Sequence, residues 1–320
     1  MPVEAKSFPD LTEKNVRFTH TNTPLAGIPW TLLGCALTAT SFLFSKLLGQ
    51  NNHLSAIEIN LYRSIVVCFL LASYAMFTGK TFRSIHIKEH WLRSTTGWGA
   101  AILQMYALNS LVPLPIIQML SYTNPIFFVL IIRFWYKEPI ALKIWGGVIL
   151  GFLGTVILLN PRGLAADHSL MYLFAALGSG LLTALTHINI QGLTHRGEPI
   201  WRIVCYYSLI SIVYDSFWFA LPFNYLQGIH TTAGMLLGTG LGIFILFGQI
   251  SMATAYSKGN PSITTIFSYS HLIYATLFSL LIFNQGINFV SSIGILIIVC
   301  GGLLTMGIKR SRLKPRVLNL

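Results

Sequence analysis

The stretch QMLSYTNPIFF, residues 118–128, places polar residues and a proline in consecutive helical turns between two long apolar runs. A polar side chain in hydrocarbon is costly unless it finds a partner, so these side chains should face a bundle interior or a hydrated cavity. Pro125 removes one backbone hydrogen bond and is expected to leave the carbonyl of Ser121 free. This stretch therefore indicates buried polar contacts or a wet cavity at the centre of a membrane-spanning helix.

The surrounding composition places the chain in a membrane. Of 320 residues, 54% are hydrophobic and only 9% are charged, and the mean hydropathy is +0.66. A spanning helix needs about 20 apolar residues. Ten such stretches occur, at 27–47, 56–78, 94–112, 115–135, 141–160, 169–193, 200–223, 231–256, 261–283 and 287–308. The sequence therefore predicts an all-α integral membrane protein and leaves no room for a soluble catalytic domain.

The distribution of charge predicts the orientation of these helices. With alternate threading, 18 of the 21 Lys and Arg, including Arg93, fall on the side of both termini, and Arg162 alone lies opposite. The remaining two, Lys46 and Arg63, lie within helices. The positive-inside rule then places both termini of a multi-pass membrane protein in the cytoplasm. The net charge of +12 is thus attributed to orientation and to anionic membrane lipids, with no nucleic acid implied.

The ends of the chain and its small motifs add little chemistry. Residues 1–26 are expected to form a cytoplasmic tail without a removable signal peptide, and residues 309–320 a basic cytoplasmic tail. The four cysteines are interpreted as small packing residues. His86 and His90 lack a third metal ligand, and no nucleotide-binding loop occurs. No metal, cofactor or catalytic residue is therefore expected.

The chain matches itself at an offset of 147 residues. Residues 105–160 align with 252–307 without a gap, with ten identities in 56 positions. The matches include the pair Ser121-Tyr122 with Ser268-Tyr269, and two glycines. Two five-helix units follow, 27–160 and 168–308, and an odd number of helices makes them inverted repeats. Such repeats are typical of transporters, which place their site at the repeat interface near mid-bilayer.

The repeat pairs the polar run of one unit with that of the other and so suggests a binding site. SYTNPIFF is matched by SYSHLIYA, which gives Asn124 and His271 equivalent positions. We expect these two segments to line a central cavity, although interhelical hydrogen bonds remain an alternative, favoured for Ser121 and Ser268. The candidate substrate-binding residues are Gln118, Tyr122, Asn124, Gln249, Tyr269, His271, Tyr274 and Arg63.

Several ionisable residues in apolar segments form a second candidate set. Arg63 is expected to attract a substrate carboxylate or phosphate, or to pair with Glu58 or Asp215. Lys46 can extend to the membrane interface. Asp215 is expected either to carry a coupling proton or to pair with Arg63 or Lys46. His187 is interpreted as a hydrogen-bonded core histidine, with a proton relay as the alternative.

Two long runs resemble the halves of a known carrier family. They are YALNSLVPLPIIQMLSYTNPIFFVLIIRFWYKEPIALKIWGGVILGFLGTVILLNP and GQISMATAYSKGNPSITTIFSYSHLIYATLFSLLIFNQ. Both resemble EamA-type carriers of the drug/metabolite transporter superfamily, and GFLGTVILLNP resembles the branch of S-adenosylmethionine uptake carriers. The resemblance implies ten helices, an inner-membrane location and transport of small metabolites such as amino acids, amines or nucleosides.

The sequence thus favours a secondary transporter that moves a small polar metabolite by alternating access. Two alternatives remain, a non-transporting membrane scaffold and an intramembrane enzyme acting on lipid. The enzyme would need histidines and acids clustered at one depth, whereas this sequence scatters them. A small-molecule substrate and membrane lipids are the expected partners, and the Gly-rich helices at 141–160 and 287–308 suggest a homodimer contact.

Overall fold

The computed structural model describes residues 25–52, 54–108, 114–159, 170–220, 231–283 and 289–306. Most of both predicted tails, Arg162 and the side chain of Lys46 lie outside the described residues. Every element in the described ranges is a helix, as expected. The helices are α1 (Ile28–Asn52), α2 (Ala56–Phe77), α3 (Ile87–Leu108), α4 (Leu114–Ser121), α5 (Asn124–Phe134), α6 (Leu142–Leu159), α7 (Leu170–His195), α8 (Ile200–Phe219), α9 (Thr232–Lys258), α10 (Pro261–Phe267), α11 (Ser270–Phe283) and α12 (Phe289–Met306).

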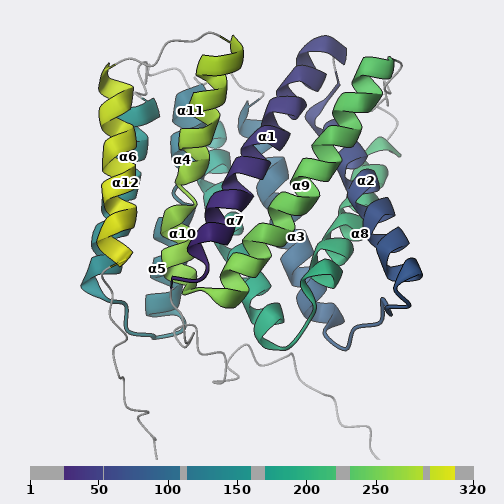
Figure 1. The fold of residues 1–320 in the computed structure, drawn as a ribbon, viewed down its shortest axis with the longest axis horizontal. Helices are drawn as coiled ribbons and strands as arrows, with labels where there is room; N and C mark the ends of the chain where they lie inside the picture. The colour runs from purple at the N-terminus through teal and green to yellow at the C-terminus, as the bar shows by residue number, and fades with distance from the viewer. Residues whose placement is uncertain are drawn as a thin grey trace, which may run out of the picture.

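The helices run roughly side by side in one bundle (Figure 1). Within the described ranges, eight segments are long and apolar enough to cross a membrane. They are α1, α2, α6, α7, α9 and α12, together with two segments that run through α4–α5 and α10–α11. The other long helices, α3 and α8, contain charged residues such as Arg93 and Asp215 and are not among the eight. This number confirms a multi-pass membrane protein but not the expected ten spans.

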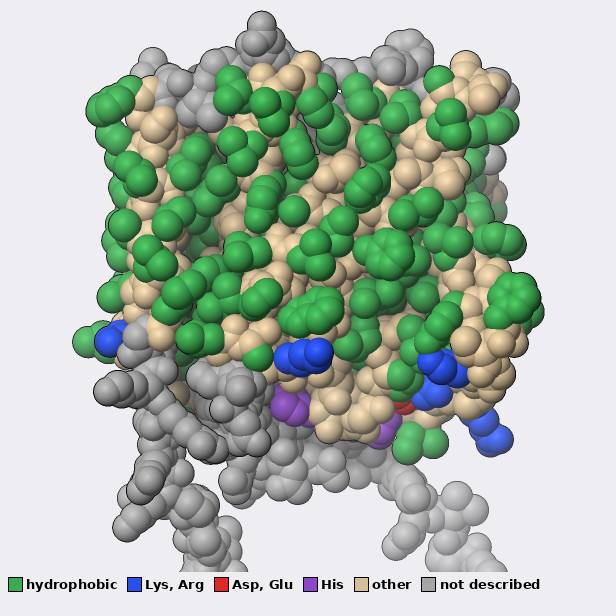
Figure 2. Space-filling view, viewed as in Figure 1, with side chains coloured by type: hydrophobic (Ala, Val, Ile, Leu, Met, Phe, Trp, Pro, Cys, Tyr) green, Lys and Arg blue, Asp and Glu red, His purple; other side chains and the backbone are tan. Residues whose placement is uncertain are grey.

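The outer surface has the character expected of a protein in lipid. Large hydrophobic side chains such as Phe69, Leu236 and Leu281 project from the sides of the bundle, each with more than two-thirds of its surface exposed. Figure 2 shows hydrophobic side chains covering much of the visible face, while Lys, Arg and His gather at its lower edge. We call this edge the basic end. It contains the first residues of α1, α3, α6, α8 and α10 and the last residues of α2, α5, α7, α9 and α12 (Figure 1).

The closest helix pairs join distant parts of the sequence. The main pairs are α6 with α12, α1 with α9, and α3 with α7. In the first pair, glycines allow the two backbones to touch. A Cβ atom added at Gly154 would lie 2.8 Å from the carbonyl of Gly294, and one added at Gly147 would lie 3.0 Å from that of Gly301.

These glycine faces are already covered within one chain. Gly147, Gly154, Gly294 and Gly301 are all buried between α6 and α12. The helices that suggested a homodimer contact therefore use their small residues for contacts inside the protomer, and the homodimer itself stays a prediction.

Replacing Gly154 by alanine is expected to destabilise the α6–α12 pair. Its Cβ would also lie 2.8 Å from the backbone nitrogen of Ile298, so a rigid backbone would have to move, at a cost of about 1–3 kcal/mol. Gly192→Ala is the matched control, because nothing lies within 4 Å of the added atom in α7. Thermal unfolding in one detergent should show a lower midpoint for Gly154→Ala only. Equal midpoints for both variants would contradict this packing.

Candidate functional site

Two helices are interrupted at positions that the repeat makes equivalent. α4 ends at Ser121 and α5 begins at Asn124, while α10 ends at Phe267 and α11 begins at Ser270. The sequence predicts one continuous helix over 115–135, whereas the structure divides this segment into two helices. Pro125 lies in the first turn of α5, where its missing N–H leaves no helical bond unmade. A similar break occurs in the second segment without a proline. Both breaks lie inside segments long enough to cross a membrane.

A cavity of about 260 Å³ lies beside the two breaks. It is lined by residues of α1, α3, α4, α5, α7, α9 and α11 and by residues of both breaks. Its lining mixes aromatic, hydroxyl, amide and imidazole side chains, among them Phe42, Tyr122, Asn124, Thr183, Gln249 and His271. This volume is far larger than a single water needs and is suited to a small organic solute.

The two breaks are joined through a contact between aromatic side chains. The hydroxyl of Tyr122 hydrogen-bonds Nδ1 of His271. The ring of Phe42 from α1 meets the edge of the His271 ring, with 5.4 Å between centroids. Asn124 and His271, which the repeat places at equivalent positions, both line the cavity. We call Phe42, Tyr122 and His271 the ring cluster.

Several polar atoms around the cavity are buried without a partner. They are Oδ1 of Asn124, Oε1 of Gln249, Nε2 of His271, and Nε and Nη1 of Arg93. All four residues line the cavity. An unpaired buried polar atom costs about 1–3 kcal/mol. Because the four residues surround one space, a solute or water in that space is the natural source of the missing hydrogen bonds.

His187 also lines the cavity, and its ring is held in place. Its Nδ1 lies 2.9 Å from the hydroxyl of Tyr256, which in turn lies 3.1 Å from Oγ1 of Thr265. The expected hydrogen-bonded core histidine is thus observed. The ring contacts the cavity as well, so the histidine is not confined to a packing role.

Other predicted substrate-binding residues do not line this cavity. Tyr269 has 0% of its surface exposed, and its ring fills the space beside Gly151 of α6. The break turns this side chain toward α6, although its repeat partner Tyr122 faces the cavity. Gln118 and Tyr274 are also absent from the described lining. The role of these three side chains in substrate binding therefore stays a prediction.

Arg63 and Asp215 form polar contacts, but not with each other. Arg63 donates from Nη2 to the hydroxyl of Tyr207 at 3.0 Å. Asp215, fully buried, accepts from Nδ2 of Asn60 at 2.5 Å and from Nε1 of Trp98 at 2.9 Å. The ion pairs in the described part of the chain involve neither residue, so the expected pairing of Asp215 with Arg63 is not observed. The alternative partner, Lys46, has its side chain outside the described residues.

Glu58 has a local structural role at the start of α2. Its backbone nitrogen donates to Oγ of Ser55, and its carboxylate accepts from the backbone nitrogen of Ser55 at 2.9 Å. This reciprocal capping box satisfies two helix-terminal donors. The contacts of the Lys46 side chain lie outside the described residues.

Sequence reasoning missed Arg93, which was placed in a basic loop outside the membrane. The structure starts α3 at Ile87, seven residues before the predicted start, and so places Arg93 two turns inside the helix. Arg93, Gly97 and Gln104 repeat at helical spacing, and this pattern could have indicated a common face. Both Arg93 and Gln104 line the cavity.

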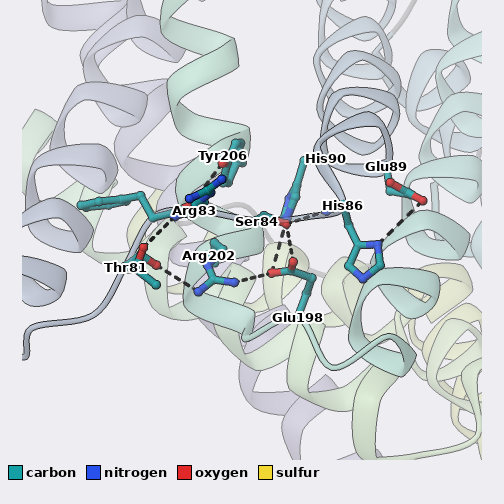
Figure 3. Close-up of polar contacts among 10 residues, drawn as sticks. Thr81, Arg83, Ser84, His86, Glu89, His90, Glu198, Arg202 and Tyr206 are labelled. Carbon is teal, nitrogen blue, oxygen red and sulfur yellow. Dashed lines mark hydrogen bonds and ion pairs between the residues drawn. The ribbon is translucent and has the colours of Figure 1, made fainter.

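At the basic end, a group of polar side chains links α3 and the segment before it to α8 and the segment between α7 and α8 (Figure 3). Its centre is Glu198, which accepts hydrogen bonds from Oγ of Ser84 and, at 3.0 Å, from Nη1 of Arg202. Nε2 of His90 lies 3.6 Å from the same carboxylate. Arg202 also donates to the carbonyl of Thr81 at 2.9 Å. We call these five residues the Glu198 cluster.

The surroundings of Glu198 favour its charged form. Burial alone would raise its pKa, but the hydrogen bonds from Ser84 and Arg202 and the charge of Arg202 outweigh burial and hold the pKa below its ordinary value. A carboxylate with a lowered pKa stabilises the fold above its ordinary pKa, and this stabilisation is lost as the pH falls through the lowered value.

Glu198→Gln should therefore lower the thermal unfolding midpoint at pH 7, by about 2–4 °C. The difference from the wild type should shrink as the pH falls below 4.5, the ordinary value for this side chain. Glu89→Gln is the control, because its pair with Arg196 is partly exposed and contributes little. A gap between Glu198→Gln and the wild type that does not change between pH 7 and pH 3.5 would contradict the assigned charge.

Comparison with known proteins places this geometry among transporters. Residues 25–160 match the model of the EamA-like transporter family. The chain is 24% identical to an S-adenosylmethionine uptake transporter of Rickettsia bellii, with 81% of this chain and 86% of that protein aligned. It is also 24% identical to a riboflavin transporter of Vibrio cholerae, with 82% and 86% aligned.

A solved crystal structure supports the fold. It superposes with a TM-score of 0.75 at 16% sequence identity and covers 88% of this chain and 97% of its own. At this identity the likeness concerns the fold alone. The family match, which begins three residues before α1 and ends just after α6, agrees with the resemblance seen in the sequence: residues 25–160 are similar to the EamA-like transporter family.

Proposed function

We propose that this protein is a secondary transporter that moves a small polar metabolite across the bacterial inner membrane by alternating access. The observation that carries the proposal is the central cavity, where Asn124, Gln249 and His271 hold buried polar atoms without partners. A scaffold gains nothing from such atoms, since each lowers stability in an apolar bundle. A transporter needs them, because its solute supplies the missing hydrogen bonds only while it is bound.

The proposal includes ten spans arranged as two inverted repeats, with α3 and α8 as the spans beyond the eight apolar segments. The packing supports this arrangement. α1 packs on α9 just as their repeat counterparts α7 and α3 pack on each other, and α2 packs on α9 as α8 packs on α3. The glycine contacts have the same symmetry. Gly147 contacts Gly301, and their repeat counterparts Gly294 and Gly154 contact each other.

Alternating access then requires contacts between the two repeats to open and close. The bond between Tyr122 and His271 joins the repeats at the cavity. The Glu198 cluster joins α3 of the first repeat to α8 of the second at the basic end. By the positive-inside rule, we assign the basic end to the cytoplasm. A solute that leaves toward the cytoplasm must therefore break the Glu198 cluster, which holds that side closed.

The ring cluster supports a solute with a planar ring. Phe42, Tyr122 and His271 offer aromatic faces and edges, which stack on flat rings. S-adenosylmethionine and riboflavin, named for two relatives, both contain a fused nitrogen ring system. Candidate solutes are thus amino-acid derivatives or nucleoside-like metabolites that combine a ring with polar groups.

The combined variant Asn124→Leu with His271→Leu should abolish transport. Purified protein in proteoliposomes is first tested for saturable exchange of labelled S-adenosylmethionine, riboflavin, amino acids and nucleosides. The variant should lower the rate for the transported solute by at least about tenfold, since both side chains lose their polar contacts with it. Phe69→Leu with Phe247→Leu, two exposed positions on α2 and α9, is the matched control.

Two results would count against a transporter. One is the absence of saturable exchange for every solute in the panel. The other is full activity of the Asn124 and His271 variant, which would favour a scaffold because a scaffold tolerates apolar replacement of central polar residues.

Asp215 is our candidate for the proton-coupling residue. It is a fully buried carboxylate whose two hydrogen-bond donors, Asn60 and Trp98, are neutral. Arg63 interacts with it electrostatically without forming an ion pair. A carboxylate held mainly by neutral donors can gain and lose a proton without disrupting a salt bridge. α8, which contains Asp215, belongs to the second repeat, and its two donors belong to the first.

Asp215→Asn should separate exchange from coupling. The amide keeps the shape of the side chain but cannot bind the proton, so solute exchange without a gradient should persist while uptake driven by a pH gradient should be lost. Trp98→Phe is the control, because it removes one hydrogen bond and leaves the carboxylate. Gradient-driven uptake by Asp215→Asn at the wild-type rate would remove Asp215 from the mechanism.

A further inference from the structure

Arg93 is the one permanently charged side chain among the described residues that line the cavity. It is only 5% exposed, and it projects from the half of α3 nearest the basic end. A buried cation in an apolar bundle is normally paired, either with a carboxylate or with hydrogen-bond acceptors. The partners of Arg93 therefore decide whether it is a structural residue or a binding residue.

Arg93 has no acidic partner in the described part of the chain. Its Nε and Nη1 atoms are buried without hydrogen bonds. The described ion pairs use the carboxylates of Glu89 and Glu198, with histidines or other arginines as their partners. Asp215 is engaged by Asn60 and Trp98. The guanidinium thus keeps unpaired donors in a residue that lines the cavity.

The charge count around Arg93 leaves one positive charge in excess. Arg63 binds the hydroxyl of Tyr207, and the guanidinium of Arg93 lies over the ring of the same tyrosine, 3.9 Å from its centroid. Among the acids in the described ranges, Asp215 is the one that interacts with this group, through Arg63. Two arginines and one aspartate sum to a net charge of +1. A single carboxylate in the cavity would neutralise it.

The surrounding residues hold Arg93 in position. Tyr207 supports one face of the guanidinium, and a Cβ atom added at Gly97 would lie 3.3 Å from Nη1 and 3.1 Å from the Tyr207 ring. Gly97 therefore provides the space that both side chains occupy. A guanidinium fixed in this way loses little rotamer entropy when it binds an anion, and its planar donors match a carboxylate.

We propose that Arg93 binds the carboxylate of the transported solute, so that the substrates are carboxylates rather than neutral or purely cationic metabolites. The inference rests on the proposed transport function and narrows its substrate class. The ring cluster and Arg93 come from different helices around one cavity, α1, α4–α5 and α11 for the rings and α3 for the cation. A solute that contacts both would carry a planar ring and a carboxylate.

Ligand pairs that differ only in the carboxylate provide the test. The probes are S-adenosylmethionine with its decarboxylated form, and L-tryptophan and L-phenylalanine with their amides. Binding to the purified full chain is measured by ligand-dependent shifts of the unfolding midpoint over a concentration series. At least one carboxylate should bind the wild type about tenfold or more tightly than its partner without a carboxylate, as expected when a charge-assisted hydrogen bond is lost.

Variants of Arg93 link this preference to one side chain. Arg93→Gln should bind the two ligands of each pair about equally, and Arg93→Lys should keep part of the preference for the carboxylate. Arg83→Gln, which removes the same charge from an exposed position before α3, should bind like the wild type. The unliganded unfolding midpoint separates a binding role from a structural one, because Arg93→Gln should leave it unchanged or raise it.

Three outcomes would overturn the assignment. The first is equal binding of the carboxylates and of their partners without a carboxylate. The second is an unchanged preference of Arg93→Gln for the carboxylates. The third is failure of every carboxylate in the panel to bind. If saturable exchange of a neutral solute is nevertheless observed, only the carboxylate assignment fails and the transport function stands. If no solute is exchanged at all, the transport function itself fails.

Discussion

Inside a membrane bundle every polar group needs a hydrogen-bond partner, and the rest of the structure depends on this constraint. The chain interrupts two of its apolar segments, at Tyr122–Thr123 and at Ser268–Tyr269. Backbone groups without hydrogen bonds are energetically costly there if they face hydrocarbon. The interruptions are tolerated because they lie inside the bundle, where Ser121 bonds to Ser179 and Tyr122 bonds to His271. Asn124, Gln249, His271 and Arg93 keep unpaired polar atoms and line one cavity, where the proposed solute would supply the missing hydrogen bonds.

Packing between the halves provides the frame in which this cavity exists. Two close helix pairs, α1 with α9 and α3 with α7, enclose much of the cavity, and α6 with α12 forms a third pair at one side (Figure 1). Each pair combines one helix from the first half of the chain with one from the second. The cavity is therefore bounded by surfaces that belong to different halves, and a relative movement of the halves changes its shape directly.

Much of the fold was predictable because hydropathy alone separates lipid-facing segments from their connections. The break near Pro125 was not predicted, because a membrane-spanning helix can accommodate a proline without ending. The cavity positions of Tyr122, Asn124 and His271 followed from the polar run and its repeat. Tyr269 did not, since the break rotates its side chain toward Gly151, and identity in a repeat carries no information about rotation.

Charged residues were the weakest part of the sequence interpretation. Arg93 was missed because a charged residue near an apolar segment was assigned to the loop, whereas α3 extends seven residues further toward the basic end. One of the two interpretations of Asp215 was an ion pair with an arginine or a lysine. In the structure its carboxylate accepts hydrogen bonds from the amide of Asn60 and the indole of Trp98. Hydropathy and charge patterns do not encode which neutral donors a fold brings to a buried carboxylate.

The contact between α6 and α12 limits how the two halves can move. We call the line of close contacts between α6 and α12 the glycine seam. Separating the two helices would open a void along this seam and expose backbone carbonyls to lipid. Rotating one helix about the seam would keep most of the contact. These two helices are thus suited to act as a pivot. The largest displacements would then occur at the far side of the bundle, around α2 and α8, and the amplitude of opening would grow with distance from the glycine seam.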